Sequence, residues 1–292
     1  MTSAVSAKGL VKRFGDFTAV DGIDLDIRQG EIFGFLGPNG AGKTTTIRVL
    51  TTLTPATEGD IEILGRRVSE LDDPVKERIG IVQQHIALDR DVTVAENIRY
   101  HAMLHRIPKE EARERIDRLV DAMGLRPYLG KLVINLSGGW KRRVAIVCAL
   151  VHDPTILFLD EPTAGLDTQS RHMLWDLIRS LNSDGRTVFV TTHYMDEAEE
   201  LCDRVAIIDR GRIVVCGTPG ELCESIGRWA VEFRSDGRKA YRYFGEWDDA
   251  VRFQESLPRE CRLSTRATNL EDVFLELTGR DVQATEEVRY RI

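Results

Sequence analysis

The chain has 292 residues, a length that suits one large domain or a domain with an appendage. Its 40 Lys and Arg residues against 47 Asp and Glu residues give a net charge of −7, which argues against nucleic acid as a partner. The longest apolar run, residues 144–151, is much shorter than the roughly 18 residues of a membrane-spanning helix, and residues 1–10 do not resemble a signal peptide. Five cysteines without a C-x-x-C pair predict reduced thiols rather than a disulfide framework or a zinc site.

The first ninety residues alternate β-rich runs with glycine and aspartate, which predicts strands feeding a helix that begins at Gly42. Further runs are short, apolar and largely β-branched, as is typical of strands buried on both faces of a parallel sheet. The predicted strands occupy residues 9–14, 19–27, 31–36, 79–82, 155–159, 187–191 and 204–208. This order indicates an α/β core.

A helical insertion is predicted at about residues 88–150. Thr93 and Glu96 form a T-x-x-E capping box that opens one helix. A second helix begins after Pro108, carries apolar residues at helical spacing and ends at Gly124.

The pattern changes past about residue 225. Apolar residues alternate with polar ones on both sides of a D-G turn at 236–237, which predicts a β-hairpin, and a closing helix ends at Gly279. We expect residues 1–225 to form the main domain and residues 226–280 a small α+β appendage. Residues 281–292 form a tail without a clear structural signal.

Residues 37–44 fit the phosphate-loop pattern G-x-x-x-x-G-K-[ST], between a predicted strand and a predicted helix. Glycines let such a loop wrap a polyphosphate, so that backbone N–H groups and the helix N-terminus face the phosphates. Lys43 would reach the β- and γ-phosphates, and Thr44 would ligate Mg²⁺. The predicted ATP-binding residues of this segment are Gly37, Pro38, Asn39, Gly40, Ala41, Gly42, Lys43, Thr44 and Thr45.

The apolar run 155–159 is followed by Asp160 and Glu161. Carboxylates at the carboxyl edge of an α/β sheet lie beside the ligand crevice, so Asp160 is a candidate to hold Mg²⁺ through water. Glu161 is a candidate to accept a proton from the attacking water. Alone, this pattern would equally fit a core strand reaching the surface; the phosphate loop favours the nucleotide site.

Leu136-Ser137-Gly138-Gly139 before a helix resembles the signature motif of ATP-binding cassette (ABC) ATPases. Other motifs follow the order of that family. They are Phe14, similar to the aromatic that stacks on adenine; Gln84, similar to the Q-loop glutamine; the segment from Glu161 to the D-loop Asp167; and His193, similar to the switch histidine. The resemblance spans about residues 5–220. It implies a P-loop NTPase fold with a RecA-like core, an antiparallel β subdomain and a helical subdomain.

The resemblance also implies a head-to-tail dimer with a second copy or a homologous cassette. ATP and Mg²⁺ held by one phosphate loop would be closed over by the signature segment of the other chain. His193 would bridge the γ-phosphate and the other D-loop, Gln84 would sense Mg²⁺ and the attacking water, and Asp167 would link the two sites. These roles rest on the resemblance.

One position departs from the family pattern, which usually has glutamine after the second signature glycine. Trp140 stands there, so an amide hydrogen bond to ribose is lost. The indole could instead stack on a ligand or pack against the helical block, and the sequence favours neither interpretation.

Residues 269–279 resemble the L-[ED]-D-V-F-L-x-L-T-G segment of ABC-2 type export cassettes, including the daunorubicin-resistance and sodium-efflux kinds. The same apolar spacing would suit a plain docking helix. The resemblance implies an integral-membrane ABC-2 permease as partner, contacted near Gln84 and the helical block at the cytoplasmic face of the cell membrane. Two alternatives stay open: a soluble ABC ATPase acting on nucleic acid or ribosomes, and a non-hydrolysing binding module. The transported substrate also stays open.

Overall fold

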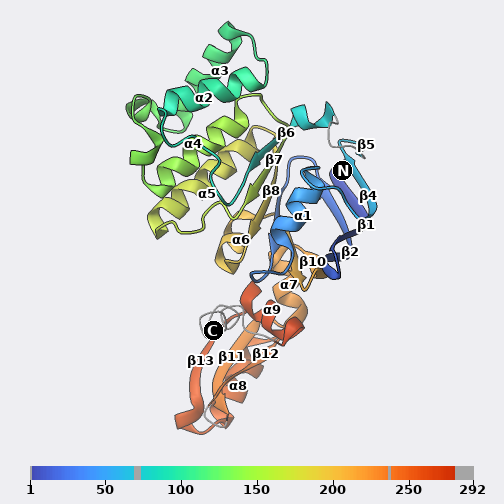
Figure 1. Ribbon diagram of the computed structural model, residues 1–292. Coiled ribbons are helices and arrows are strands. Elements are labelled where there is room, and N and C mark those ends of the chain that lie inside the picture. The colour runs from blue at the N-terminus through green and yellow to red at the C-terminus, as the bar shows by residue number, and fades with distance from the viewer. Residues whose placement is uncertain (1, 69–73, 236–237, 280–292) are drawn as a thin grey trace.

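The structure is a computed structural model that describes residues 2–68, 74–235 and 238–279 (Figure 1). At its centre lies a six-stranded sheet of order β10-β9-β3-β8-β7-β6, in which all neighbours are parallel except β10 and β9. Its strands are β3 (Ile32–Leu36), β6 (Ile79–Val82), β7 (Ile156–Asp160), β8 (Thr187–Thr192), β9 (Arg204–Asp209) and β10 (Arg212–Gly217). The α/β class predicted from the sequence is confirmed.

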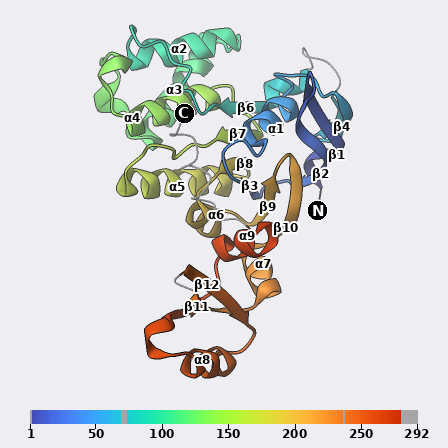
Figure 2. The same cartoon turned by 60° about the horizontal axis from the view of Figure 1, so that its bottom comes forward.

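Alternate residues of the central strands enter two separate cores, one on each face of the sheet. Phe33 and Phe35 belong to the core shared with α1 (Lys43–Leu50), whereas Ile32 and Leu36 belong to the core under the helices of the opposite face. Those helices include α4 (Gly138–Leu150), α5 (Thr168–Ser183) and α6 (Met195–Leu201), which lie across the sheet from α1 in Figures 1 and 2. Burial on both faces explains why these strands are almost wholly apolar.

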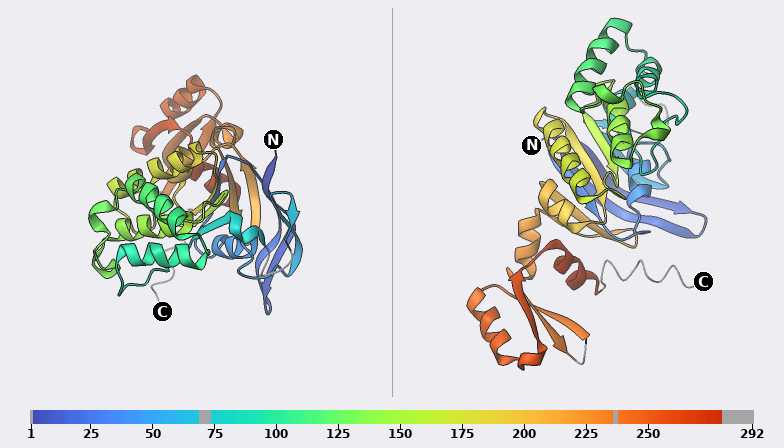
Figure 3. Two further views of the ribbon diagram at one scale, coloured as in Figure 1. Left: turned by 90° about the horizontal axis from the view of Figure 1, so that it is seen from above. Right: turned by 90° about the vertical axis from the view of Figure 1, so that its left-hand side faces the viewer.

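An antiparallel sheet of order β2-β1-β4-β5 covers α1. Its strands are β1 (Ser3–Phe14), β2 (Phe17–Arg28), β4 (Glu58–Ile63) and β5 (Arg66–Arg67). The first two are longer than predicted, and β4 was not predicted, because only its alternate residues Ile61 and Ile63 are buried. Figure 3 shows this sheet and the helical block at opposite ends of the central sheet.

The helical block contains α2 (Val94–Leu104) and α3 (Lys109–Ala122), both of which pack with α4. The predicted capping box is present: Glu96 N–H donates to Thr93 Oγ1 at 3.2 Å, and Thr93 N–H donates to the Glu96 carboxylate at 2.8 Å. Gly124 has a φ of 65°, which supports its predicted role in ending α3. Three 3₁₀ turns accompany these helices, at Pro74–Arg78, Arg126–Tyr128 and Val133–Asn135.

After α7 (Pro219–Ile226) the chain forms a small three-stranded sheet of order β12-β11-β13. Its strands are β11 (Trp229–Ser235), β12 (Arg238–Phe244) and β13 (Arg262–Ala267), and α8 (Trp247–Ser256) packs against one face. The predicted hairpin is confirmed by the β11–β12 pairing, while its turn at 236–237 lies outside the described residues, as does the tail. Neither α8 nor β13 was predicted.

The last described helix, α9 (Leu270–Thr278), ends at Gly279 as predicted and returns to the main body. Leu270, Val273 and Phe274 are buried in the same core as α6 and α7, so α9 packs against these two helices (Figure 2). Within the described ranges, every helix is too short or too polar to cross a bilayer.

Candidate nucleotide site

The phosphate loop lies at the carboxyl end of β3 and is pressed against neighbouring backbone. A Cβ atom on Gly37 would come within 2.2 Å of the Ile208 carbonyl oxygen, and one on Gly42 within 2.5 Å of the Ala19 carbonyl oxygen. Gly42 also has a φ of 113°, which L side chains rarely adopt. Both glycines are therefore required by the tight loop that precedes the N-terminus of α1, where backbone N–H groups are available to an anion.

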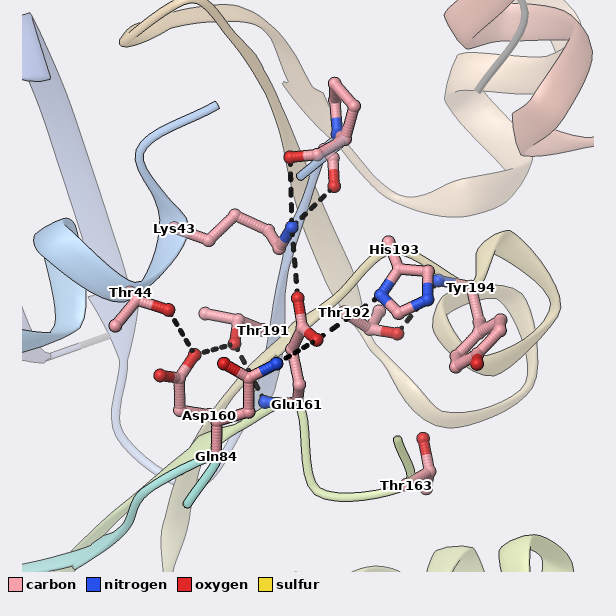
Figure 4. Close-up of polar contacts among 12 residues, drawn as sticks. Lys43, Thr44, Gln84, Asp160, Glu161, Thr163, Thr191, Thr192, His193 and Tyr194 are labelled. Carbon is pink, nitrogen blue, oxygen red and sulfur yellow. Dashed lines mark hydrogen bonds and ion pairs between the residues drawn. The ribbon is translucent and has the colours of Figure 1, made fainter. Parts of the chain in front are cut away.

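Lys43 is buried in this loop, and its ammonium group contacts both the loop and an acid (Figure 4). Lys43 Nζ donates to the carbonyls of Gly37 and Pro38 at 2.7 and 3.1 Å and lies 3.2 Å from Glu161 Oε1. Burial lowers the pKa of Lys43, and the negative charge of Glu161 opposes that effect. The cation is thus held at the mouth of the loop by groups that a phosphate could replace.

Thr44 and Asp160 provide oxygen ligands next to the loop. Thr44 Oγ1 donates to Asp160 Oδ1 at 3.2 Å, and Thr191 Oγ1 donates to the same oxygen at 2.6 Å. Asp160 is the last residue of β7, so this strand ends in an acid, as predicted. Hydroxyl and carboxylate oxygens are the ligands that Mg²⁺ prefers, so this donor set fits that ion.

Glu161 adopts an uncommon backbone conformation directly after β7. Its φ is 45°, in the left-handed region that costs a non-glycine residue energy. Its N–H donates to both the backbone oxygen and the hydroxyl of Thr191, at 3.1 and 3.0 Å. The Thr191 hydroxyl therefore holds Asp160 and Glu161 together, and Glu161 turns away from the strand direction.

Three side chains surround the Glu161 carboxylate (Figure 4). Gln84 Nε2 donates to Oε2 at 3.0 Å, His193 Nδ1 lies 3.4 Å from the same oxygen, and Lys43 lies against Oε1. The histidine distance is long for a hydrogen bond. Burial raises the pKa of Glu161, but His193 and Lys43 together outweigh it and hold this pKa below its ordinary value.

The signature and D-loop segments lie next to each other at the N-terminal ends of α4 and α5. Ser137 is the N-cap residue of α4 without a capping bond from its hydroxyl, and a Cβ atom on Gly139 would lie 3.5 Å from the Ser170 hydroxyl oxygen. Asp167 caps α5, because Oδ1 accepts the Ser170 N–H at 2.9 Å and Oδ2 accepts the Ser170 hydroxyl at 2.7 Å. The signature and D-loop segments of this chain are thus neighbours. The helix α4 lies on the opposite face of the central sheet from α1, which follows the phosphate loop (Figure 1).

The two aromatic candidates have different surroundings. Phe14, at the end of β1, is 52% exposed and has Lys12 Nζ 5.0 Å from its ring centroid, so its ring is available to a ligand. Trp140 lies between Tyr128, with ring centroids 4.2 Å apart, and the Arg143 guanidinium, 4.9 Å from the indole centroid. Within this chain the indole packs against the helical block.

Sequence reasoning did not single out Thr191, Arg142 or Glu197. Thr191 is the second-last residue of β8 and lies two residues before His193, a position at the ligand edge that could have indicated it. Arg142 and Glu197 are buried and form hydrogen bonds with residues distant in sequence. No local sequence pattern predicts such contacts. The fold, the glycine loop and the two acids after β7 define a phosphate-loop nucleotide-binding protein.

Comparison with known proteins supports a narrower class. The family model described as "ABC transporter" matches residues 20–164. The chain is 38% identical over 307 residues to the Nod factor export ATP-binding protein I of Ralstonia nicotianae, covering 97% of this chain and 96% of that protein. It is 43% identical over 233 residues to the daunorubicin/doxorubicin resistance ATP-binding protein DrrA of Streptomyces peucetius, covering 80% and 71%.

Solved structures agree. CbiO1 of Clostridium perfringens, part of the ABC transporter complex cbiONQ, matches with a TM-score of 0.70 and 30% identity over 76% of this chain and 91% of that chain. A dimeric post-hydrolysis ATP-binding cassette bound to ADP and Pi matches with a TM-score of 0.67 and 29% identity over 73% and 98%. The chain belongs to the ABC transporter family, in which it is an ATP-binding subunit with ATPase activity.

Proposed function

We propose that this chain is the ATP-hydrolysing subunit of an exporter, that it dimerises head to tail around two ATP molecules, and that it drives a separate membrane permease. The observation that carries the proposal is the convergence of Lys43, Gln84 and His193 on one buried carboxylate, Glu161, beside the phosphate loop. A phosphate-binding cation, a carboxylate and two polar side chains meet there at the carboxyl edge of a parallel sheet.

ATP binding begins with an exchange of partners at Lys43. The ammonium group would leave the carbonyls of Gly37 and Pro38 and bind the β- and γ-phosphates, which replace the negative charge of Glu161. Thr44 and Asp160, with Gln84, would hold Mg²⁺. When bound, this ion neutralises phosphate charge as a Lewis acid. The exposed ring of Phe14 would stack on adenine.

Hydrolysis then needs a base and a positioned water. Glu161 would accept a proton as the water oxygen bonds to the γ-phosphorus and the bond from that phosphorus to the β–γ bridging oxygen breaks, giving ADP and inorganic phosphate. A glutamate carboxyl is ionised at neutral pH, as a base requires. Gln84 and His193 would orient the water and contact the γ-phosphate.

A second cassette would complete the site. Ser137, Gly138 and Gly139 lie at the N-terminus of α4, where hydroxyl, backbone N–H groups and helix dipole suit a phosphate of the other chain. Asp167, which caps α5 beside this segment, would link the two sites. The similarity to a dimeric cassette bound to ADP and Pi supports this arrangement.

The names of the relatives, Nod factor export and daunorubicin/doxorubicin resistance, support export as the direction of transport. A partner surface is available on the helical block, where Tyr100, Met103 and Leu104 are 60%, 73% and 58% exposed on one face of α2. Beside it, a groove of about 310 Å³ runs along the Q-loop and is lined by residues that include Leu53 and Ile86. We propose that an integral-membrane ABC-2 permease docks here, at the cytoplasmic face of the membrane.

The first experiment measures ATP turnover and ATP-dependent dimerisation of the Glu161→Gln variant. Turnover should fall by roughly 10² to 10⁴, the scale of general-base catalysis, while light scattering detects a stable dimer at saturating ATP. Glu200→Gln, which changes an exposed carboxylate on α6, is the matched control and should behave as the wild type. A Glu161→Gln variant that stays monomeric, or that hydrolyses ATP normally, contradicts the proposal.

The second experiment concerns the partner. The full chain should co-purify with membranes, leave them on alkaline extraction, and cross-link through a photoreactive group at position 103 to one integral-membrane protein. A cross-linker on exposed Glu255 of α8 serves as the control position. Recovery with ribosomes or nucleic acid instead of membranes would favour a soluble ABC ATPase over an exporter subunit.

A further inference from the structure

Arg142 is a buried cation beside the proposed catalytic residues. It lies in the second turn of α4, five residues after Ser137, and is only 4% exposed. No carboxylate in the described part of the chain lies within ion-pair distance of its guanidinium group. Burial lowers the pKa of Arg142, and the negative charges of Asp160 and Glu161 oppose this. A cation kept at such a position without a paired acid needs its own set of acceptors.

Those acceptors are three backbone carbonyls from two functional segments. Arg142 Nη1 donates to the Gln83 carbonyl at 2.8 Å, and Nη2 donates to the carbonyls of Gln84 and Glu161 at 3.2 and 3.4 Å. Gln83 and Gln84 follow β6, and Glu161 follows β7. One planar, rigid guanidinium therefore fixes the distance between the Q-loop backbone and the backbone of Glu161, the residue with a φ of 45°.

The same two residues meet through their side chains, since Gln84 Nε2 donates to Glu161 Oε2 at 3.0 Å. Arg142 holds the two backbones at the base of this contact. It belongs to α4, whereas the carbonyls belong to the edge of the central sheet. A displacement of α4 relative to the sheet would therefore alter the Gln84–Glu161 contact through Arg142.

We propose that Arg142 is a positioning residue for ATP hydrolysis: it sets the place of Gln84 next to Glu161 and couples the position of the signature helix to that contact. This inference rests on the proposed function. The guanidinium of Arg142 donates to the carbonyls of Gln83, Gln84 and Glu161. Its effect is on turnover, through Gln84, and not on nucleotide affinity.

The test compares Arg142→Met with Arg262→Met in the full chain. Arg262 is the matched control, because its guanidinium also bridges two carbonyls, those of Leu257 and Glu255 at 2.9 and 2.5 Å, far from the nucleotide site. We expect Arg142→Met to lower kcat by about 10- to 100-fold with KM for ATP within threefold, and Arg262→Met to keep both within threefold. Arg142→Met with wild-type kcat overturns the proposal.

A double-mutant cycle with Gln84→Ala separates positioning from general packing. If Arg142 acts through Gln84, then Arg142→Met should lower kcat by less than threefold in the Gln84→Ala background. An equal fold-loss in both backgrounds means that Arg142 acts independently of Gln84, which overturns the proposal. Should Arg142→Met fail to fold, Arg142→Lys repeats the cycle, because an ammonium group keeps the charge but loses the fork that bridges the carbonyls.

The same measurements distinguish a failure of the proposed function from a failure of the proposal for Arg142. Wild-type hydrolysis that Glu161→Gln abolishes supports the proposed function, whatever Arg142→Met does. A folded wild-type chain without ATP turnover overturns the proposed function and this inference together, whereas an unaffected Arg142→Met in an active background overturns this inference alone.

Discussion

Lys43 Nζ lies 3.2 Å from Glu161 Oε1, and the two side chains are only 4% and 7% exposed. The proposed phosphate-binding cation and the proposed base therefore hold each other before ATP binds. In the proposed function, nucleotide would displace Glu161 from Lys43, and this exchange would free the carboxylate for the attacking water. The ion pair would then tie substrate binding to the activation of the base.

Lys43→Ala should lose ATP affinity. Removing a charge-assisted contact of about 1.5 to 3 kcal/mol raises the ATP dissociation constant by roughly 10- to 100-fold. The pKa of Glu161 should also rise in this variant, because Lys43 is one of the groups that hold it down. Fluorescent-nucleotide titration measures the affinity, with Lys109→Ala, an exposed position at the start of α3, as the control. Unchanged affinity would remove Lys43 from the nucleotide site.

Trp140→Gln should keep ATPase activity, with turnover within about threefold of wild type. The indole packs between Tyr128 and Arg143 within its own chain, so its loss should lower the free energy of unfolding by about 1 to 3 kcal/mol. Urea unfolding and steady-state turnover are measured on the same preparation. A folded variant with nearly no turnover would show that the indole is needed for catalysis, contrary to this reading.

The glycine loop, the acids after β7 and the capping box could be predicted because each is a local pattern with its own chemistry. The contact between Gln84 and Glu161 could not, since it joins residues 77 positions apart and depends on β6 lying beside β7. Motif order suggested that these residues act together; only the sheet topology places them at hydrogen-bond distance.

In the C-terminal unit, the sequence predicted the hairpin but not the strand β13. Its hairpin has strong alternation and a turn signal, whereas every residue of the largely polar strand β13 is half-buried or exposed. Such a strand has no apolar pattern of its own and is defined by its partner β11.

Asp272→Ala should loosen α9 from the small sheet. Asp272 is buried and forms the capping box of α9 with Asn269. Its carboxylate also accepts hydrogen bonds from two guanidinium nitrogens of Arg266 and from the hydroxyl of Tyr243. Loss of the bond from Asn269 N–H to the Asp272 carboxylate and of a partly exposed ion pair should lower the free energy of unfolding by about 1 to 3 kcal/mol. Limited proteolysis should then cut between β13 and α9. Glu276→Ala, on the exposed side of α9, is the control, and equal protection of both variants would contradict this role.

Glu197→Gln should make stability less dependent on pH. Glu197 is fully buried and accepts the Thr163 hydroxyl and the Trp175 indole N–H, both at 3.0 Å. Burial raises the pKa of Glu197 above its ordinary value of 4.5, although the hydrogen bonds oppose it. The folded chain therefore keeps this proton to higher pH than the unfolded chain does, and wild-type stability declines as pH rises from about 4.5 through the folded-state pKa, by at most about 1.4 kcal/mol per pH unit.

Glutamine can satisfy the same partners, with its oxygen toward Trp175 and its amide toward the Thr163 hydroxyl, without a charge to bury. The variant should thus gain stability relative to wild type as pH rises, a difference that urea unfolding at about pH 5 and about pH 8 can resolve. Glu200→Gln, an exposed carboxylate on the same helix, should follow the wild-type curve. If the free energy of unfolding changes with pH in the same way for Glu197→Gln and wild type, Glu197 has the same pKa in the folded and unfolded chain. The hydrogen bonds from Thr163 and Trp175 would then fully offset the cost of burying its carboxylate.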